Sequence, residues 1–408
     1  PEFGAHPYEA QFRRFLAELW SGYFAKQREF LRSLGCRALL TDLNWYATPY
    51  LSAIRDNFDL VDNHQYHDHP SFPVQEWRMP FGFTNTNPVL ELASTPRELM
   101  PPRIFGKPFT VTEFNYCFPN PYRNGGTLLF GAYAALQDWD GVYRFAWSHE
   151  ADAIKRTKEI GPFDIVNDPA AQLAERLGIL LFRRGDAAPG KERTAYILGN
   201  TPEEWTAQVY PAPFTRLGLR QQIGTVLAEK ALPAGVKPFA GNDQAEAKVI
   251  TSDTGEITLD AENGDFRAVT PRTEGFMLAS GRPGVGKVVK VTPDRNFQVA
   301  AAAVRDNAAS LATSKRILIV HLSQSVNFKA RFDSPERKLL ESLGSAPLLL
   351  HVAEADFELD LPALRNPKLY RLDHTGKRLG ELSFSRENGK IRFRNQAAET
   401  PALELTGE

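Results

Sequence analysis

"KPFTVTEFN", residues 107–115, decides the fold together with the two stretches that follow it, "GTLLFGAYAALQDW" (126–139) and "GVYRFAWSH" (141–149). The first and third stretches are short apolar runs, and the second has the length and composition of a buried helix. Parallel strands need a crossover connection, which is usually a helix. The three stretches therefore predict two parallel strands joined by a helix.

The same alternation continues on both sides of this unit. The predicted elements are a helix over 9–34 ended by Gly35, a strand over 36–45 ("CRALLTDLNW"), a helix near 49–57, a strand over 58–66 ("FDLVDNHQY"), a long loop with a helix, and a last helix over 168–182. Four strand–helix units with buried strands indicate an α/β domain, which we expect over residues 1–185.

The rest of the chain has a different pattern. From about Glu192 it consists of short strand-like runs separated by turns, and "ENGD" (262–265) and "HTGK" (374–377) are typical of hairpins. We expect a β-sandwich of seven or more strands over 246–408. Residues 186–245 are rich in Pro, Gly and Ala and are predicted to be a connecting segment with one helix around 214–230.

Composition excludes several classes of protein. The 408 residues carry a formal net charge of -1, which gives no support to a nucleic-acid or anionic-membrane partner. No apolar run approaches the roughly 18 residues that a membrane span needs. The two cysteines, Cys36 and Cys117, are predicted at opposite ends of parallel strands, so we expect two free thiols.

The predicted strands become polar and aromatic only where they end. The four ends are residues 42–45 (Asp-Leu-Asn-Trp), 62–66 (Asp-Asn-His-Gln-Tyr), 112–115 (Thr-Glu-Phe-Asn) and 146–149 (Ala-Trp-Ser-His). A (β/α)8 barrel has its active face at the carboxyl ends of its strands, and a doubly wound sheet also binds ligands there. None of the four turns carries a glycine-rich phosphate loop. The pattern favours a binding or catalytic site at these ends.

With these motifs the chain resembles the clan A glycoside hydrolases, which are cellulase-like (β/α)8 enzymes. The stretches 36–45, 58–66, 107–115 and 141–149 are similar to their fifth to eighth strands, and 252–277 and 314–327 resemble the C-terminal sandwich of large bacterial members. The resemblance implies that Glu113 is the catalytic nucleophile, that Tyr66 donates a hydrogen bond to it, and that Trp147 stacks on the sugar. Further candidate hydroxyl-binding residues at the strand ends are Asn44, Trp45, His64, Asn115 and His149.

One departure from the family pattern is large. In this clan the acid/base Glu follows an Asn at the end of the fourth strand, and no Asn-Glu pair precedes the helix that begins near Tyr8. By this mapping the chain supplies strands five to eight of a (β/α)8 TIM barrel, followed by the β-sandwich. We therefore expect the N-terminal half of the barrel on a separate or cleaved chain, a β-linked oligo- or polysaccharide substrate, no cofactor, and a secreted or periplasmic location. A non-catalytic carbohydrate-binding protein on a degenerate barrel is the alternative.

Two motifs suggest other chemistry and are interpreted differently. His64, His67 and His69 lie close in sequence, but His64 belongs to the strand and the other two follow its end, so we predict a cleft wall and no metal site. "GRPGVGKV" (281–288) resembles a phosphate-binding loop, yet Val288 replaces the required hydroxyl residue and strands flank it on both sides. We predict a hairpin turn there.

Overall fold

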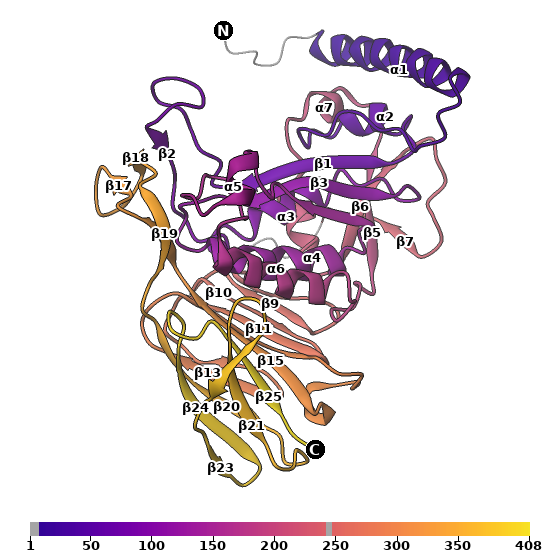
Figure 1. Cartoon of the computed structure of the whole chain (residues 1–408). Coiled ribbons are helices and arrows are strands. Elements are labelled where there is room, and N and C mark those ends of the chain that lie inside the picture. The colour runs from indigo at the N-terminus through magenta and orange to yellow at the C-terminus, as the bar shows by residue number, and fades with distance from the viewer. Residues whose placement is uncertain (1–7, 242–246) are drawn as a thin grey trace.

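The computed structural model describes residues 8–241 and 247–408, which form an α/β part and a β-sandwich packed against each other (Figure 1). At the centre of the α/β part is a parallel sheet of order β1-β3-β4, made by Val61–His67, Phe109–Tyr116 and Gly141–Arg144. The crossover helix α4 (Gly126–Leu136) is buried along its whole length. The strand–helix–strand unit predicted from residues 107–149 is confirmed.

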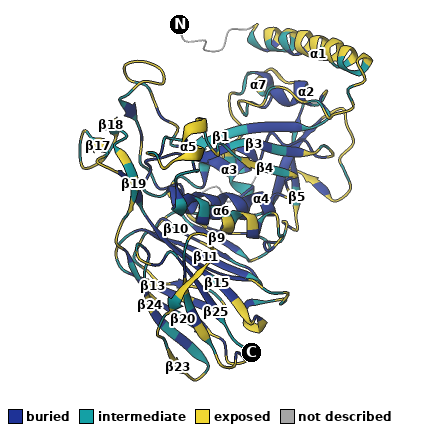
Figure 2. Ribbon diagram, in the orientation of Figure 1, coloured by how far each residue is buried: buried dark blue, intermediate teal, exposed yellow. Residues whose placement is uncertain are grey.

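Other elements of this part are short, except for the first and last helices. They are α1 (Glu9–Ser33), α2 (Leu51–Arg55), β2 (Phe81–Gly82), α3 (Ser94–Leu99), the 3-10 helix η1 (Arg123–Gly125), α5 (Ala151–Lys155) and α6 (Pro169–Leu181). Helix α1 ends as predicted, because Gly35 adopts a φ of 84° and the chain turns away. Its outer face is exposed to solvent (Figure 2) and carries Phe12, Phe15, Leu19, Tyr23 and Phe30. Within the described ranges, no helix is long and apolar enough to cross a bilayer.

The expectation of half a (β/α)8 barrel is wrong. Residues 36–45 form no strand, so the sheet has three parallel strands and β1 is its edge. A nearby side chain holds the end of this stretch: the buried guanidinium of Arg55 donates hydrogen bonds to the carbonyls of Leu43, Trp45 and Tyr46. These carbonyls are therefore not free to pair with β1, and Leu43 and Tyr46 adopt positive φ angles that a strand does not accommodate.

A second small parallel sheet, of order β6-β5-β7, lies in the segment predicted as a connection. Its strands are β5 (Arg193–Leu198), β6 (Gln222–Leu227) and β7 (Val236–Pro238), and α7 (Pro202–Thr206) and α8 (Ala212–Leu217) join the first two. The predicted connecting segment therefore contains a sheet, and the single helix predicted around 214–230 is wrong, because α8 ends at Leu217 and β6 begins at Gln222. Helix α8 ends at Gly218, where a Cβ atom would lie 2.9 Å from the Ile223 side chain, and the buried strand β6 follows.

The β-sandwich consists of two antiparallel sheets. The larger has nine strands in the order β22-β21-β25-β15-β14-β11-β10-β9-β8, and the smaller has five in the order β12-β13-β20-β24-β23. The strands are β8 (Val249–Thr251), β9 (Ile257–Asp260), β10 (Asp265–Val269), β11 (Thr273–Leu278), β12 (Gly284–Val285), β13 (Val289–Pro293), β14 (Gln298–Val304), β15 (Arg316–Ser323), β20 (Glu354–Asp360), β21 (Lys368–Leu372), β22 (Arg378–Glu381), β23 (Ser385–Glu387), β24 (Lys390–Gln396) and β25 (Ala402–Thr406), with a 3-10 turn η2 (Leu311–Thr313).

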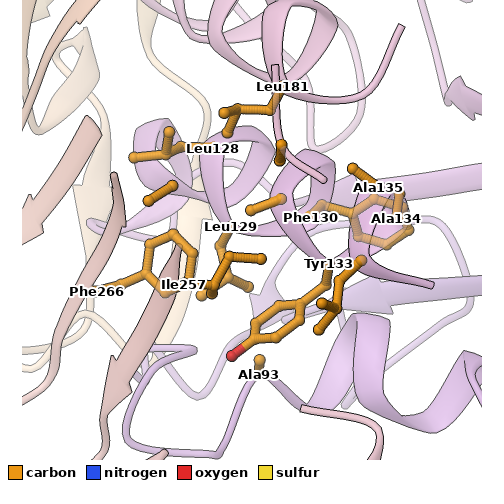
Figure 3. Close-up of a cluster of buried hydrophobic side chains, with 14 of the residues drawn as sticks. Ala93, Leu128, Leu129, Phe130, Tyr133, Ala134, Ala135, Leu181, Ile257 and Phe266 are labelled. Atoms are coloured by element: carbon orange, nitrogen blue, oxygen red, sulfur yellow. The ribbon is translucent and has the colours of Figure 1, made fainter. Parts of the chain in front are cut away.

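The nine-stranded sheet is buried on both faces. Along β14, Ala300 and Ala302 face the five-stranded sheet, whereas Val299 and Ala301 pack toward the α/β part. On that second face, Leu128 and Tyr133 of α4 meet Phe266 of β10 (Figure 3). Continuous burial explains why β14 is apolar from Val299 to Val304 instead of alternating with polar residues.

An arm of the sandwich reaches the α/β part. It contains β16 (Ser325–Phe328), β17 (Arg331–Phe332), β18 (Leu339–Ser342) and β19 (Ser345–Leu350). Strand β18 pairs with β2, so one small sheet, β17-β18-β2, combines residues from both parts of the molecule (Figure 1). The arm thereby braces the long loop that follows β1.

The stretch "GRPGVGKV" is a hairpin, as predicted, because β12 pairs with β13. A carboxylate occupies the position that an anion would take in a phosphate loop: Glu274 accepts hydrogen bonds from the backbone N–H groups of Lys287, Val288 and Val289. Burial raises the pKa of Glu274, although these hydrogen bonds act against the shift. The chain thus fills this N–H cluster itself.

Buried His321 is expected to make the protein less stable in acid. Burial lowers the pKa of His321 from 6.5 to about 4, while Gln298 and Asn395 hold the neutral ring by hydrogen bonds of 2.7 and 2.9 Å. Between pH 6.5 and 4 the unfolded chain binds more protons, so stability present above pH 6.5 is lost as the pH falls. The loss approaches about 3 kcal/mol near pH 4.

The measurement is the denaturant midpoint of unfolding at pH 7 and at pH 4.5. His321→Gln keeps one donor and one acceptor but does not titrate, so its midpoint is expected to change less between the two pH values. Equal changes in both proteins would contradict the role assigned to His321.

Candidate active site

Glu113 lies at the carboxyl end of β3, opposite His64 of β1. Tyr66, two residues further along β1 and on the same face, donates a hydrogen bond to Glu113 Oε2. His64 Nδ1 lies 3.3 Å from the same oxygen. The hydrogen bond expected between Tyr66 and Glu113 is therefore present. The Glu113 side chain is 32% exposed, so it remains accessible to a ligand.

A buried carboxylate supports His64 from the other side. Asp62 Oδ2 lies 3.3 Å from His64 Nε2, and Thr112 Oγ1 lies 2.8 Å from that nitrogen. Asp62 also accepts hydrogen bonds from the Thr110 and Thr112 side chains. Burial acts to raise the pKa of Asp62, but the hydrogen bonds from His64, Thr112 and Thr110 outweigh it and lower that pKa. Asp62 is thus an ionised anchor that fixes the imidazole beside Glu113.

The ring of Tyr66 is held by aromatic neighbours. Its centroid lies 5.3 Å from that of Phe163, 5.4 Å from His69 and 6.2 Å from Phe145. Burial raises the pKa of Tyr66 far above its ordinary value, and the adjacent Glu113 raises it further. The phenol is therefore neutral at physiological pH and always available as a hydrogen-bond donor.

Under the glycosidase expectation drawn from the sequence, replacing Tyr66 by phenylalanine lowers kcat/KM for an aryl glycoside about 10- to 100-fold. The variant keeps the ring contacts but loses a hydrogen bond to a charged acceptor, which contributes about 1.5–3 kcal/mol. The effect is measured as kcat/KM on an aryl glycoside for the wild type and the variant, at a temperature at which both are fully folded. Unchanged kinetics would show that the Tyr66 hydroxyl has no part in the reaction.

Trp45 lines a cleft next to His64. Its ring lies edge-on to His64 at 6.5 Å, and its loop is fixed by Arg55 and by an Asn63 hydrogen bond to the Tyr46 carbonyl. Burial lowers the pKa of Arg55 to about 10. The cleft has a volume of about 700 Å³, and its walls include Trp45, Tyr46, Asn63, His64, Gln65 and Glu98.

The other predicted ligand-binding residues occupy different environments. Trp147 follows β4 and is 53% exposed, and Asn44 is also exposed. His149 Nδ1 lies 2.5 Å from Asp164 Oδ1. The buried amide of Asn115 donates hydrogen bonds to the carbonyls of Phe145 and Phe163, so its N–H groups hold the loops around the site.

The three neighbouring histidines separate in space. His64 faces Glu113, His67 is buried with Nε2 3.0 Å from the Thr86 carbonyl, and His69 packs among aromatic rings. Within residues 8–241 and 247–408, no group of three or more His, Cys, Asp or Glu side chains could hold a metal ion. Cys36 and Cys117 are free thiols.

Sequence reasoning missed two contributors to this site. Asp62 belongs to the same strand face as His64 and Tyr66, and that two-residue periodicity was a usable signal. Phe163 lies in the irregular segment after α5, and no local pattern connects it with Tyr66.

Comparison with known proteins found no matching family model, no similar curated protein and no similar solved structure.

Proposed function

We propose that the protein is a retaining glycoside hydrolase that cleaves a β-glycosidic bond, with Glu113 as the nucleophile. The observation that carries the proposal is the partly exposed Glu113 carboxylate, which is held by the Tyr66 hydroxyl and flanked by His64 at the rim of an aromatic surface. Aromatic faces suit the apolar C–H face of a pyranose. The resemblance of β1, β3 and β4 to strands of clan A enzymes supports the same assignment, whereas residues 36–45 form no strand and do not contribute to it.

In the proposed reaction an oxygen of Glu113 attacks the anomeric carbon while the bond to the leaving oxygen breaks. A carboxylic acid protonates the leaving oxygen. The carboxylate so formed then takes a proton from water, whose oxygen attacks the same carbon and releases the carboxylate of Glu113. The groups in direct contact with Glu113 are the phenol of Tyr66 and the imidazole of His64, so the acid/base carboxyl of this reaction is not one of its direct contacts. Tyr66 positions the nucleophile in both steps.

The test uses substrates whose leaving group needs no proton. Dinitrophenyl β-glycosides of glucose, galactose, mannose and xylose release a stable phenolate, so we expect turnover of at least one of them by this chain alone. A 2-deoxy-2-fluoro glycoside of the same sugar should form a covalent adduct, and peptide mass mapping should place the adduct on Glu113. An adduct on another residue would refute the nucleophile assignment.

A non-catalytic carbohydrate-binding protein is the second candidate. Among the described residues, the groups in direct contact with Glu113 are a phenol and an imidazole, and neither is the second carboxyl that double displacement needs. Binding of oligosaccharides without release of phenolate and without a covalent adduct would establish this alternative.

A further inference from the structure

The long loop between β1 and β2 carries a tryptophan with an exposed indole. Trp77 is 54% exposed, although one side of its ring packs against Phe72 at 4.6 Å and His69 at 5.7 Å. Within the described part of the chain, its indole N–H makes no hydrogen bond. Tryptophan is highly buried on average in folded proteins, and its ring offers an apolar face to a ligand where it is exposed.

Trp77 is connected to the proposed nucleophile through one layer of rings. His69 and Phe163 both contact Trp77, at 5.7 and 6.0 Å, and both contact Tyr66, at 5.4 and 5.3 Å. Tyr66 in turn holds Glu113. The exposed indole of Trp77 therefore lies close to the Glu113 carboxylate without contacting it.

The loop that presents Trp77 is rigidly held at its base. Ser71 and Gly82 exchange two backbone hydrogen bonds of 2.9 Å across it. Asp68 accepts hydrogen bonds from the Thr84 and Asn85 backbones and from the Asn120 side chain. A side chain fixed in this way loses little conformational freedom when it binds a ligand.

The sandwich arm adds a second support. Strand β18 pairs with β2, the Phe83 N–H donates to the Lys338 carbonyl over 2.8 Å, and Asn85 donates to the Arg337 carbonyl. Leu340 of the arm packs in one apolar cluster with Phe81 and Phe83. Contacts from a distant part of the chain thus fix a loop whose outermost large aromatic side chain remains uncovered.

We propose that Trp77 is a second sugar-stacking surface and that the protein's ligand is a β-linked oligosaccharide, with one unit at Glu113 and a further unit on Trp77. The inference rests on the proposed function for the position of the first unit. Stacking on Trp77 accounts for its exposure and for the support that its loop receives, because a sugar can cover the ring while its hydroxyls remain hydrated.

The experiment compares a short and a long substrate in Trp77→Ala and Trp77→Phe. The short substrate is the dinitrophenyl monosaccharide that is hydrolysed fastest, and the long one is its dinitrophenyl β-1,4-linked tetrasaccharide. We expect Trp77→Ala to raise KM for the tetrasaccharide about 10-fold and to leave the monosaccharide within twofold, whereas Trp77→Phe keeps most of the affinity. Trp20→Ala, which removes an exposed tryptophan on α1, is the control and should change neither.

Equal losses on both substrates would overturn the inference, because they would show that Trp77 only supports the fold of the site. If no substrate is hydrolysed, the proposed function fails and calorimetry still tests Trp77. In that case β-1,4-linked tetrasaccharides of glucose, galactose, mannose and xylose are titrated into the wild type and Trp77→Ala. Weaker binding by the variant supports the stacking surface, and equal binding or no binding by the wild type refutes it.

Discussion

Glu113→Gln is expected to reduce kcat for dinitrophenyl glycosides by at least about 10³-fold, because an amide cannot form the covalent glycosyl intermediate. Glutamine keeps the shape of the side chain and still accepts the hydrogen bond from Tyr66, so the fold and the ring packing should be unchanged. Rates are measured at saturating substrate, and the variant should bind sugar while releasing almost no phenolate. The fluoro-glycoside adduct should also disappear.

The matched control is Glu150→Gln. Glu150 follows β4 at the same end of the sheet, is exposed, and pairs with Lys158 instead of with Tyr66 or His64. Its removal should leave kcat within twofold. If Glu113→Gln retained wild-type activity, the nucleophile would have to be sought elsewhere and the proposed function would lose its main support.

Asp168→Ala is expected to lower the free energy of unfolding by about 3–5 kcal/mol, because it leaves the buried Arg123 guanidinium without its counter-charge. The two side chains form an ion pair and are 0% and 3% exposed. Asp168 also caps α6 by accepting a hydrogen bond of 2.9 Å from the Ala171 N–H, and Arg123 donates to Ser325 at the start of the arm. The Arg123–Asp168 pair therefore connects the start of α6, η1 and the sandwich arm.

The unfolding midpoint in guanidinium chloride, followed by tryptophan fluorescence, measures this loss. The double variant Arg123→Met/Asp168→Ala should cost less than the sum of the single changes, since it removes the charge that the single variant leaves buried. Glu192→Gln, which removes an exposed partner of Lys237, should leave the midpoint unchanged. A small loss in Asp168→Ala, similar to that of Glu192→Gln, would contradict the assigned role.

Elements set by local patterns could be predicted from the sequence. Helical spacing and Gly35 defined α1, and apolar runs defined β1, β3 and the buried α4. Residues 36–45 have a similar apolar run, but the contact with Arg55 takes their carbonyls away from a ladder. Arg55 lies only 12 residues after Leu43, but a side-chain hydrogen bond to a carbonyl leaves no periodic pattern in the sequence, so the predicted fourth strand and the half barrel built on it were wrong.

In the candidate site, too, the features set by local sequence patterns could be predicted and those set by tertiary contacts could not. The approach of Tyr66 and Glu113 follows from two parallel strands that end at one edge, which the sequence does indicate. Trp77 and Phe163 lie on irregular segments whose position depends on each other and on the sandwich arm. Short apolar runs also do not reveal their partners, so the parallel pairing of β5 with β6 inside the predicted connecting segment was missed.

The doubly covered nine-stranded sheet has a consequence for domain exchange. Gly275 of β11 lets α4 approach so closely that an added Cβ would lie 2.7 Å from Leu128 Cδ1, and this surface would be lost with the sandwich. The arm that braces the Trp77 loop would be lost as well. A chimaera that keeps the α/β part but takes its sandwich from another protein would therefore inherit an uncovered core and an unsupported substrate loop. The α/β part and the sandwich occupy separate stretches of the chain, but they share a core and cannot be exchanged independently.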